Sequence, residues 1–243
     1  MKRMWYLPLL FAVFFIFSPA AYCDLYWESE VTSGGMPSNL PKQLQEQMKA
    51  QFKTKTEIVK NYLASDAFRS ETPDNIMIME FGNMIMYQIN IRDKSYMKFD
   101  LMSVMGGKKG QMDKMMNEGM KITPTKETKE ISGYKCKKYN VTIMGANTEY
   151  WVSKDVKGLD EFKAMNKKME KIAEKSPMLK KMNMAGMMNK LDGFPVQTVM
   201  SIMGMNTITT LKTIEKKSLD KGLFKVPKGY KLKQMRMPPS KKK

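Results

Sequence analysis

Hydrophobic and polar residues alternate along most of the chain, and this alternation predicts a protein built mainly from β-strands. Side chains of a strand point to opposite faces in turn, so a period of two is typical of a strand with one buried face. Glycine, asparagine and proline separate the alternating segments, as expected of turns. The predicted strands span residues 25–32, 54–63, 67–71, 76–81, 84–89, 95–100, 134–144, 148–153, 196–203 and 205–214, and strand signals also resume at Lys126.

A helical period interrupts the strands between residues 159 and 191. Its apolar stripe is surrounded by lysines and consists of Phe162, Met165 and Met169. Ser176-Pro177 is expected to divide the region into two helices. Residues 38–51 are expected to hold another short helix, and the Met-, Gly- and Lys-rich residues 101–120 a mobile or partly helical connection. Together these elements predict an α+β fold.

Two hairpins have one face that is clearly apolar. In the first, an even loop at Gly145-Ala146 would pair Ile143 with Thr148 and Val141 with Tyr150, and would leave Trp151 on the polar face. The second turns at Gly204. We predict that the apolar faces of both hairpins line a ligand cavity, whose candidate residues are Tyr139, Val141, Ile143, Tyr150, Val152, Met200 and Ile202.

A third hairpin, around Gly82-Asn83, has two apolar faces. One face carries four methionines, Met77, Met79, Met84 and Met86, and Met79 is expected opposite Met86; the other carries Ile76, Ile78, Ile85, Tyr87 and Ile89. Two apolar faces imply either a second covering layer or a ligand cavity. Thioether sulfur also binds Cu(I), so a copper site is an alternative, although methionine is more often adaptable packing material. We predict no metal and no cofactor.

The first 23 residues have the three-part pattern of an export signal. Lys2 and Arg3 precede the apolar residues 7–17, Ser18-Pro19 interrupt that run, and Ala21 and Cys23 occupy the positions that a signal peptidase reads. The mature chain is therefore predicted to begin at Asp24, in the periplasm. Lipidation of Cys23 is the alternative, and the bulky Tyr22 argues against it. Residues 24–237 are predicted to form one domain, and residues 238–243 a disordered basic tail.

The charge of the chain favours anionic partners. Its formal net charge is +18, and it falls to +16 when Lys2 and Arg3 leave with the signal peptide. Outside the cytoplasm such partners include an anionic membrane surface, and no motif of a nucleic-acid-binding protein accompanies the charge. Catalytic groups are scarce, because the chain has no histidine and Cys136 would be the one cysteine left after cleavage. We therefore predict a protein that is not an enzyme.

Four separated motifs resemble a known bacterial family, called domain of unknown function 4412. They are KEISGYKCKKY at residues 129–139, EYWVSKD at 149–155, GFPV at 193–196 and LFKVPKGY at 223–230. The resemblance implies membership of the LolA-like superfamily, in which a strongly curved antiparallel β half-barrel is closed by helices. That superfamily contains lipoprotein and lipid carriers as well as envelope stress sensors.

Composition and resemblance together suggest an exported, non-enzymatic protein that holds a lipid or another apolar ligand, such as an acyl chain, in its sheet. A protein-interaction or stress-sensing module is the alternative, because fold alone does not determine function. The protein partner in that case is unknown.

Overall fold

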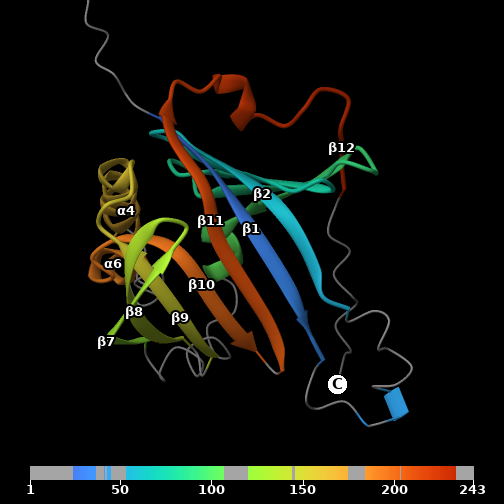
Figure 1. Ribbon diagram of the computed structural model, residues 1–243. Helices are drawn as coiled ribbons and strands as arrows, with labels where there is room; N and C mark the ends of the chain where they lie inside the picture. The colour runs from blue at the N-terminus through green and yellow to red at the C-terminus, as the bar shows by residue number, and fades with distance from the viewer. Residues whose placement is uncertain are drawn as a thin grey trace, which may run out of the picture.

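The computed structural model describes residues 24–36, 41, 43–44, 53–106, 120–143, 146–174, 184–202 and 204–233. The described residues form one 12-stranded sheet (Figure 1). Its strands are β1 (Asp24–Gly35), β2 (Lys55–Leu63), β3 (Ala67–Glu71), β4 (Asn75–Glu80), β5 (Ile85–Asn90), β6 (Ser95–Asp100), β7 (Met120–Ile131), β8 (Tyr134–Ile143), β9 (Ala146–Ser153), β10 (Phe194–Ile202), β11 (Met205–Lys217) and β12 (Lys231–Leu232). Their order is β12-β6-β5-β4-β3-β2-β1-β11-β10-β9-β8-β7.

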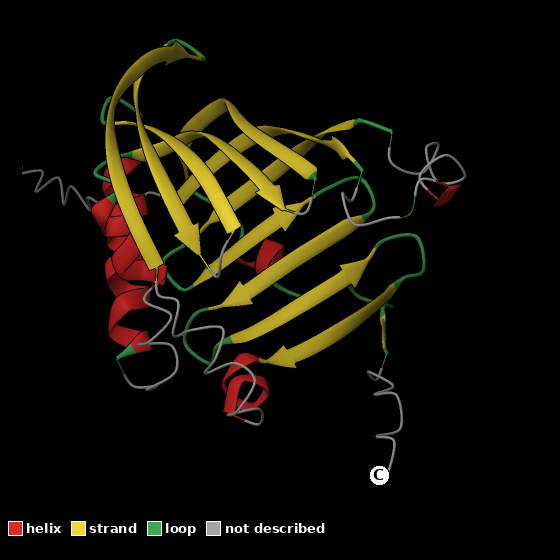
Figure 2. Ribbon diagram, turned by 90° about the horizontal axis from the view of Figure 1, so that it is seen from below, coloured by secondary structure: helices red, strands yellow, loops and turns green. Residues whose placement is uncertain are grey.

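The sheet is mixed and open. Each pair of neighbouring strands is antiparallel except β12 and β6, which run parallel. The sheet twists across its width (Figure 2), as β-sheets do, but it is neither closed nor strongly curled, and β7 and β12 lie at opposite edges. The predicted antiparallel sheet is confirmed apart from this one parallel pair, and the predicted α+β class is corrected to a mainly β fold with few helices among the described residues. The predicted strongly curved half-barrel is wrong in its degree of curvature.

Helices cover one face of the sheet, which we call the helix side. Helix α4 (Leu159–Ala173) packs Phe162 against Phe194 of β10, with ring centroids 4.9 Å apart. The predicted stripe is confirmed, since Met165 and Met169 belong to the same core as Phe162. Gly158 allows the helix to start here: its φ is 92°, and a Cβ atom would lie 2.3 Å from a methyl carbon of Leu25. The predicted second helix is present as α6 (Met184–Lys190).

The C-terminal segment covers part of the opposite face, which we call the C-terminal side. A 3-10 helix, η1 (Lys221–Phe224), places Phe224 in a cluster with the buried Ile78 and Ile89. Arg69, from the same face of β3, donates through Nη1 to the Leu223 carbonyl oxygen at 2.9 Å. The isoleucine face of the third predicted hairpin is thus covered by protein. This answers the question that the sequence left open for those strands.

The strand registers confirm most predicted faces and correct one pairing. Met79 lies opposite Met86, as predicted. Ile202 pairs with Met205, so the two residues share a face of the β10–β11 hairpin. In the β8–β9 hairpin, however, Val141 pairs with Thr148 instead of Tyr150. The turn is two residues shorter than predicted, because β9 begins at Ala146 and Ile143 pairs with it directly. A shift of two residues preserves the faces, so Trp151 still lies on the side opposite to Tyr150.

Other boundaries differ, and some predictions fall outside the described residues. Strand β7 begins at Met120, which is six residues before the predicted start. The connection predicted at 101–120 begins with a short helix, α2 (Leu101–Gly106), so its partly helical character is confirmed there. The described part of the chain does not include residues 1–23, most of 38–51, Ser176-Pro177 or 238–243. The predictions made for those residues remain predictions.

Candidate functional site

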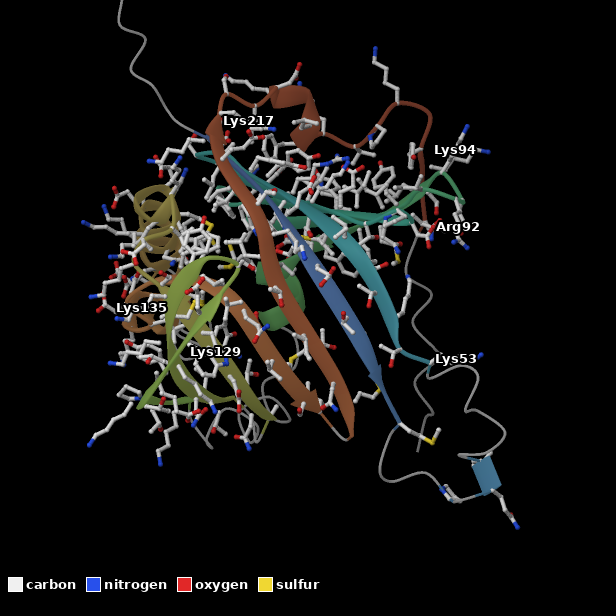
Figure 3. All side chains as sticks on the ribbon, in the orientation of Figure 1. Lys53, Arg92, Lys94, Lys129, Lys135 and Lys217 are labelled. Carbon is white, nitrogen blue, oxygen red and sulfur yellow. The ribbon has the colours of Figure 1, made fainter. Side chains whose placement is uncertain are left out.

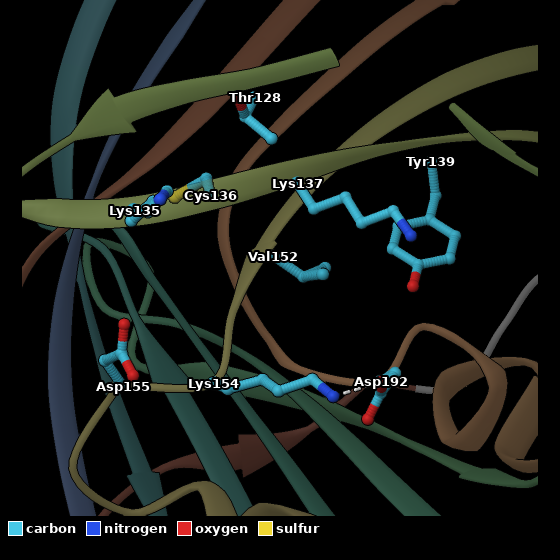
Figure 4. A pocket seen from close by; sticks show the side chains of 9 residues that line it. All are labelled: Thr128, Lys135, Cys136, Lys137, Tyr139, Val152, Lys154, Asp155 and Asp192. Atoms are coloured by element: carbon cyan, nitrogen blue, oxygen red, sulfur yellow. Dashed lines mark ion pairs between the residues drawn. The ribbon is translucent and has the colours of Figure 1, made fainter. Parts of the chain in front are cut away.

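A pocket of about 370 Å³ opens at one end of the β8–β9 hairpin (Figure 4). Its floor is apolar and buried, and its rim is charged. Lysines alternate with other residues along β8, so that they lie on the same face as Tyr139. The lining residues are Thr128, Lys135, Cys136, Lys137, Tyr139, Val152, Lys154, Asp155 and Asp192.

The rim of the pocket carries more positive than negative side chains. Lys154 Nζ lies 2.5 Å from Asp192 Oδ2, and this hydrogen bond raises the pKa of the lysine (Figure 4). Lys135 and Lys137 are exposed beside that pair, and Asp155 is the second acid of the rim. Lys137 Nζ also lies 5.5 Å from the centre of the Tyr139 ring, a cation–π geometry. The rim therefore attracts an anion.

The floor of the pocket is formed by Tyr139 and Val152, which are 7% and 3% exposed. Cys136 also lines the pocket, but it alternates with Lys135 and Lys137, so its side chain points to the opposite face of β8, where it belongs to the same core as Trp151. Burial raises the pKa of the Cys136 thiol, although Lys129 acts in the opposite direction, and Sγ donates to the Tyr134 carbonyl oxygen at 3.3 Å. Burial also raises the pKa of Tyr139, and the negative charge of Asp192 adds to the effect. A thiol kept protonated at neutral pH is a poor nucleophile, so this geometry favours binding over covalent chemistry.

Glycine positions the acidic end of the pocket. The segment that links α6 to β10 passes close to β9, and a Cβ atom on Gly193 would lie 2.9 Å from the Ser153 carbonyl oxygen. Asp192, just before it, has a left-handed φ of 42°. Only a residue without a side chain allows this approach, which brings Asp192 within reach of Lys154. The GFPV motif therefore contributes to the geometry of the pocket.

The predicted cavity residues fall into two groups. Four of them, Tyr139, Val141, Tyr150 and Val152, pack with Leu191 and Met188 on the helix side. Of these, Tyr139 and Val152 also line the pocket. Met200 and Ile202 lie farther along the same face, where they are 38% and 43% exposed. Ile143 ends β8 opposite Ala146.

Sequence reasoning missed the charged rim. The signal for Lys135 and Lys137 was present, because they stand four and two residues before Tyr139 and so share its face. Asp192 gave no such signal, because its position depends on how α6 connects to β10. Among the described residues no group of three or more His, Cys, Asp or Glu side chains could hold a metal ion. The methionine hairpin pairs Met79 with Met86, and Met79 packs against the main core.

The family model for a domain of unknown function, DUF4412, matches residues 35–230. This range includes all four motifs on which the resemblance was based. The chain belongs to the DUF4412 family. No curated protein matches its sequence.

Solved structures similar to this DUF4412 protein are distant. A domain from Vibrio parahaemolyticus, described as belonging to an outer membrane lipoprotein-sorting protein, is 9% identical; the match covers 84% of this chain and 90% of that chain, with a TM-score of 0.37. PNGF-II in its C2 crystal form is 14% identical with a TM-score of 0.36, and the match covers 85% of this chain. The DUF4412 chain spans only 30% of the length of PNGF-II. Among the described helices, none is long and apolar enough to cross a bilayer.

Proposed function

We propose that this DUF4412 protein is a non-catalytic binding protein of the bacterial envelope, and that its pocket holds an amphiphilic ligand with an apolar chain and an anionic group. The observation that carries the proposal is the apolar floor of Tyr139 and Val152 beneath a rim that includes Lys135 and Lys137. An apolar chain would lie on the floor, and the anionic group would contact the lysines. The export signal pattern of residues 1–23 supports a location outside the cytoplasm.

The size of the pocket is adequate for a short acyl chain. Its volume of about 370 Å³ lies in the lower part of the range for small-molecule sites, about 300–1,000 Å³. Each buried methylene contributes about 0.8 kcal/mol, so six contribute about 5 kcal/mol. The lysines are exposed and screened by solvent, and together add about 1 kcal/mol. The expected dissociation constant is therefore in the range of tens of micromolar.

Calorimetric titration with dodecanoate and with uncharged dodecanol tests this proposal. The double variant Lys135→Glu, Lys137→Glu should weaken dodecanoate binding about tenfold, because two attractive contacts become repulsive, and should change dodecanol binding less than about twofold. The matched control is Lys163→Glu, Lys167→Glu, which makes the same charge change at exposed positions of α4. It should leave both affinities within about twofold of the wild type.

Two results would contradict the proposal. The first is the absence of saturable binding of either ligand to the wild-type protein. The second is equal weakening by both double variants, which would mean that dodecanoate responds to overall charge and not to the pocket. In either case a protein-interaction or stress-sensing role becomes the better explanation.

A further inference from the structure

Large apolar side chains are exposed on both faces of the sheet where β10 turns into β11. On the helix side, Met200, Ile202 and Met205 are 38%, 43% and 46% exposed. They form one patch, because Ile202 pairs with Met205 and Met200 precedes Ile202 by two residues on the same strand face. On the C-terminal side, Ile208 is 38% exposed and pairs with Val199. We call these four exposed residues the hairpin tip.

The backbone of the hairpin tip is paired on both sides. Strand β9 flanks β10 as far as Asn147, which lies opposite Ser201, and β1 flanks β11 as far as Gly35, which lies opposite Met205. The tip is therefore part of a continuous sheet and not an open edge. Paired strands can approach an apolar phase at low cost, because only unpaired backbone N–H and C=O groups carry a large free-energy penalty there.

Two basic residues lie at the same end of the sheet as the hairpin tip. Lys53, just before β2, extends near this end of the sheet (Figure 3). Lys121 lies in β7 opposite Thr142, near the same end. Most acids of the neighbouring strands have a lysine partner: Glu57 pairs with Lys55 at 2.8 Å, and Glu149 and Glu127 share Lys138, at 3.0 and 3.4 Å. Together with Lys53 and Lys121, these groups carry four positive and three negative charges, so the region around the tip has one positive charge in excess.

We propose that the hairpin tip docks on an anionic lipid surface, with its apolar side chains in the interfacial layer and Lys53 and Lys121 near the headgroups. A partner protein would cover one face of a sheet, whereas a lipid layer contacts both faces at once where the ends of paired strands insert into it. Exposure on both faces therefore favours lipid. Basic residues beside apolar ones are the combination that binds anionic membranes, because electrostatic attraction and burial of apolar area add together.

This docking surface is separate from the ligand pocket. The pocket includes Val152 and Lys154 at the end of β9, whereas the hairpin tip lies beside Asn147 at the start of the same strand. Strands rise about 3.3 Å per residue, so the two sites are about 17–23 Å apart along β9. Docking can therefore be tested independently of the proposed function.

Vesicle flotation tests the docking surface, using the protein purified after export from a bacterial host. The wild type should float with vesicles of phosphatidylethanolamine and phosphatidylglycerol at 3:1, and about tenfold less with pure phosphatidylcholine. The double variant Ile202→Asn, Met205→Asn should reduce partition to the anionic vesicles at least about tenfold. Both positions are exposed, so circular dichroism and thermal unfolding should remain those of the wild type. The matched control, Leu232→Asn, changes a 55% exposed apolar residue elsewhere and should reduce partition less than about twofold.

Insertion is distinguished from adsorption by a tryptophan placed in the hairpin tip. Emission from the added residue of Met205→Trp should be quenched by brominated phosphatidylglycerol, and emission from that of Leu232→Trp should not. Three outcomes would overturn the proposal: a wild type that does not float, an Ile202→Asn, Met205→Asn variant that floats as well as the wild type, or equal quenching of both tryptophans. A wild-type dimer that the double variant dissociates would identify a second copy of the chain as the occupant.

Discussion

The packing of Phe224 on the C-terminal side of the sheet allows a quantitative test of the fold. Its side chain is 9% exposed and lies in the cluster that contains Ile78 and Ile89. Truncating a buried phenylalanine to alanine costs about 3–5 kcal/mol, partly from lost burial and partly from the cavity that remains. Because η1 is a short surface element that can partly close the cavity, we expect Phe224→Ala to lower the free energy of unfolding by about 3 kcal/mol. That is a large fraction of the roughly 5–15 kcal/mol that stabilises a typical domain.

Equilibrium urea unfolding, followed by circular dichroism, measures this effect. The control is Leu232→Ala, because Leu232 is 55% exposed and its truncation should change the free energy of unfolding by less than about 0.5 kcal/mol. A loss below about 1 kcal/mol for Phe224→Ala would show that the C-terminal segment does not cover the isoleucine face in solution. Binding of a hydrophobic dye to the folded variant would show that the segment detaches before the sheet unfolds.

Three further predictions concern the backbone, the pH dependence and the N-terminus. Gly193→Ala should lower the free energy of unfolding by roughly 1–3 kcal/mol, because the added Cβ would crowd the β9 backbone. The control is Gly82→Ala, which should be nearly neutral in the same urea assay because nothing lies within 4 Å of a Cβ at that position. Burial raises the pKa of Cys136 and of several tyrosines, so above about pH 8.5 the folded state retains protons that the unfolded state loses. The free energy of unfolding should therefore fall from about pH 8 to about pH 10.5. A flat pH profile would contradict the burial of these groups. Intact-mass measurement of the exported protein should give a chain that begins at Asp24, and a mass that includes Cys23 with acyl chains would contradict cleavage after that residue.

The strands could be predicted from sequence because their signal is local. Residues 67–71 and 95–100 were predicted with the boundaries of β3 and β6, since alternation and turn residues delimit both segments. The sheet face on which a side chain lies was predicted more reliably than its partner on the neighbouring strand. In the β8–β9 hairpin the pairing of Val141 was wrong by two residues, yet its face was correct, because strand side chains repeat with a period of two.

Contacts between distant segments could not be predicted in this way. Phe224 packs near Ile78, and the two residues are separated by more than half of the chain, so no local period relates them. The parallel pairing of β12 with β6 also joins segments that are far apart in the chain, so no local pattern predicts it. The pocket depends on such a contact too, because Lys154 and Asp192 meet only after α6 has returned the chain to β9. Lys135 and Lys137 of the rim could therefore be placed from the sequence, whereas Asp192 could not.

The arrangement of covering elements explains why the two proposed sites lie where they do. A sheet with apolar residues on both faces needs a cover on each side, and here α4 and α6 supply one while the segment around Phe224 supplies the other. Apolar groups that remain accessible must then lie at the margins of these covers. The pocket lies beside Asp192, where α6 ends, and the hairpin tip around Ile202 shows by its exposure that the described elements cover it incompletely. A ligand site next to a helix end and a docking surface at the opposite end of β9 would let the protein stay on a membrane while its pocket remains open to solvent.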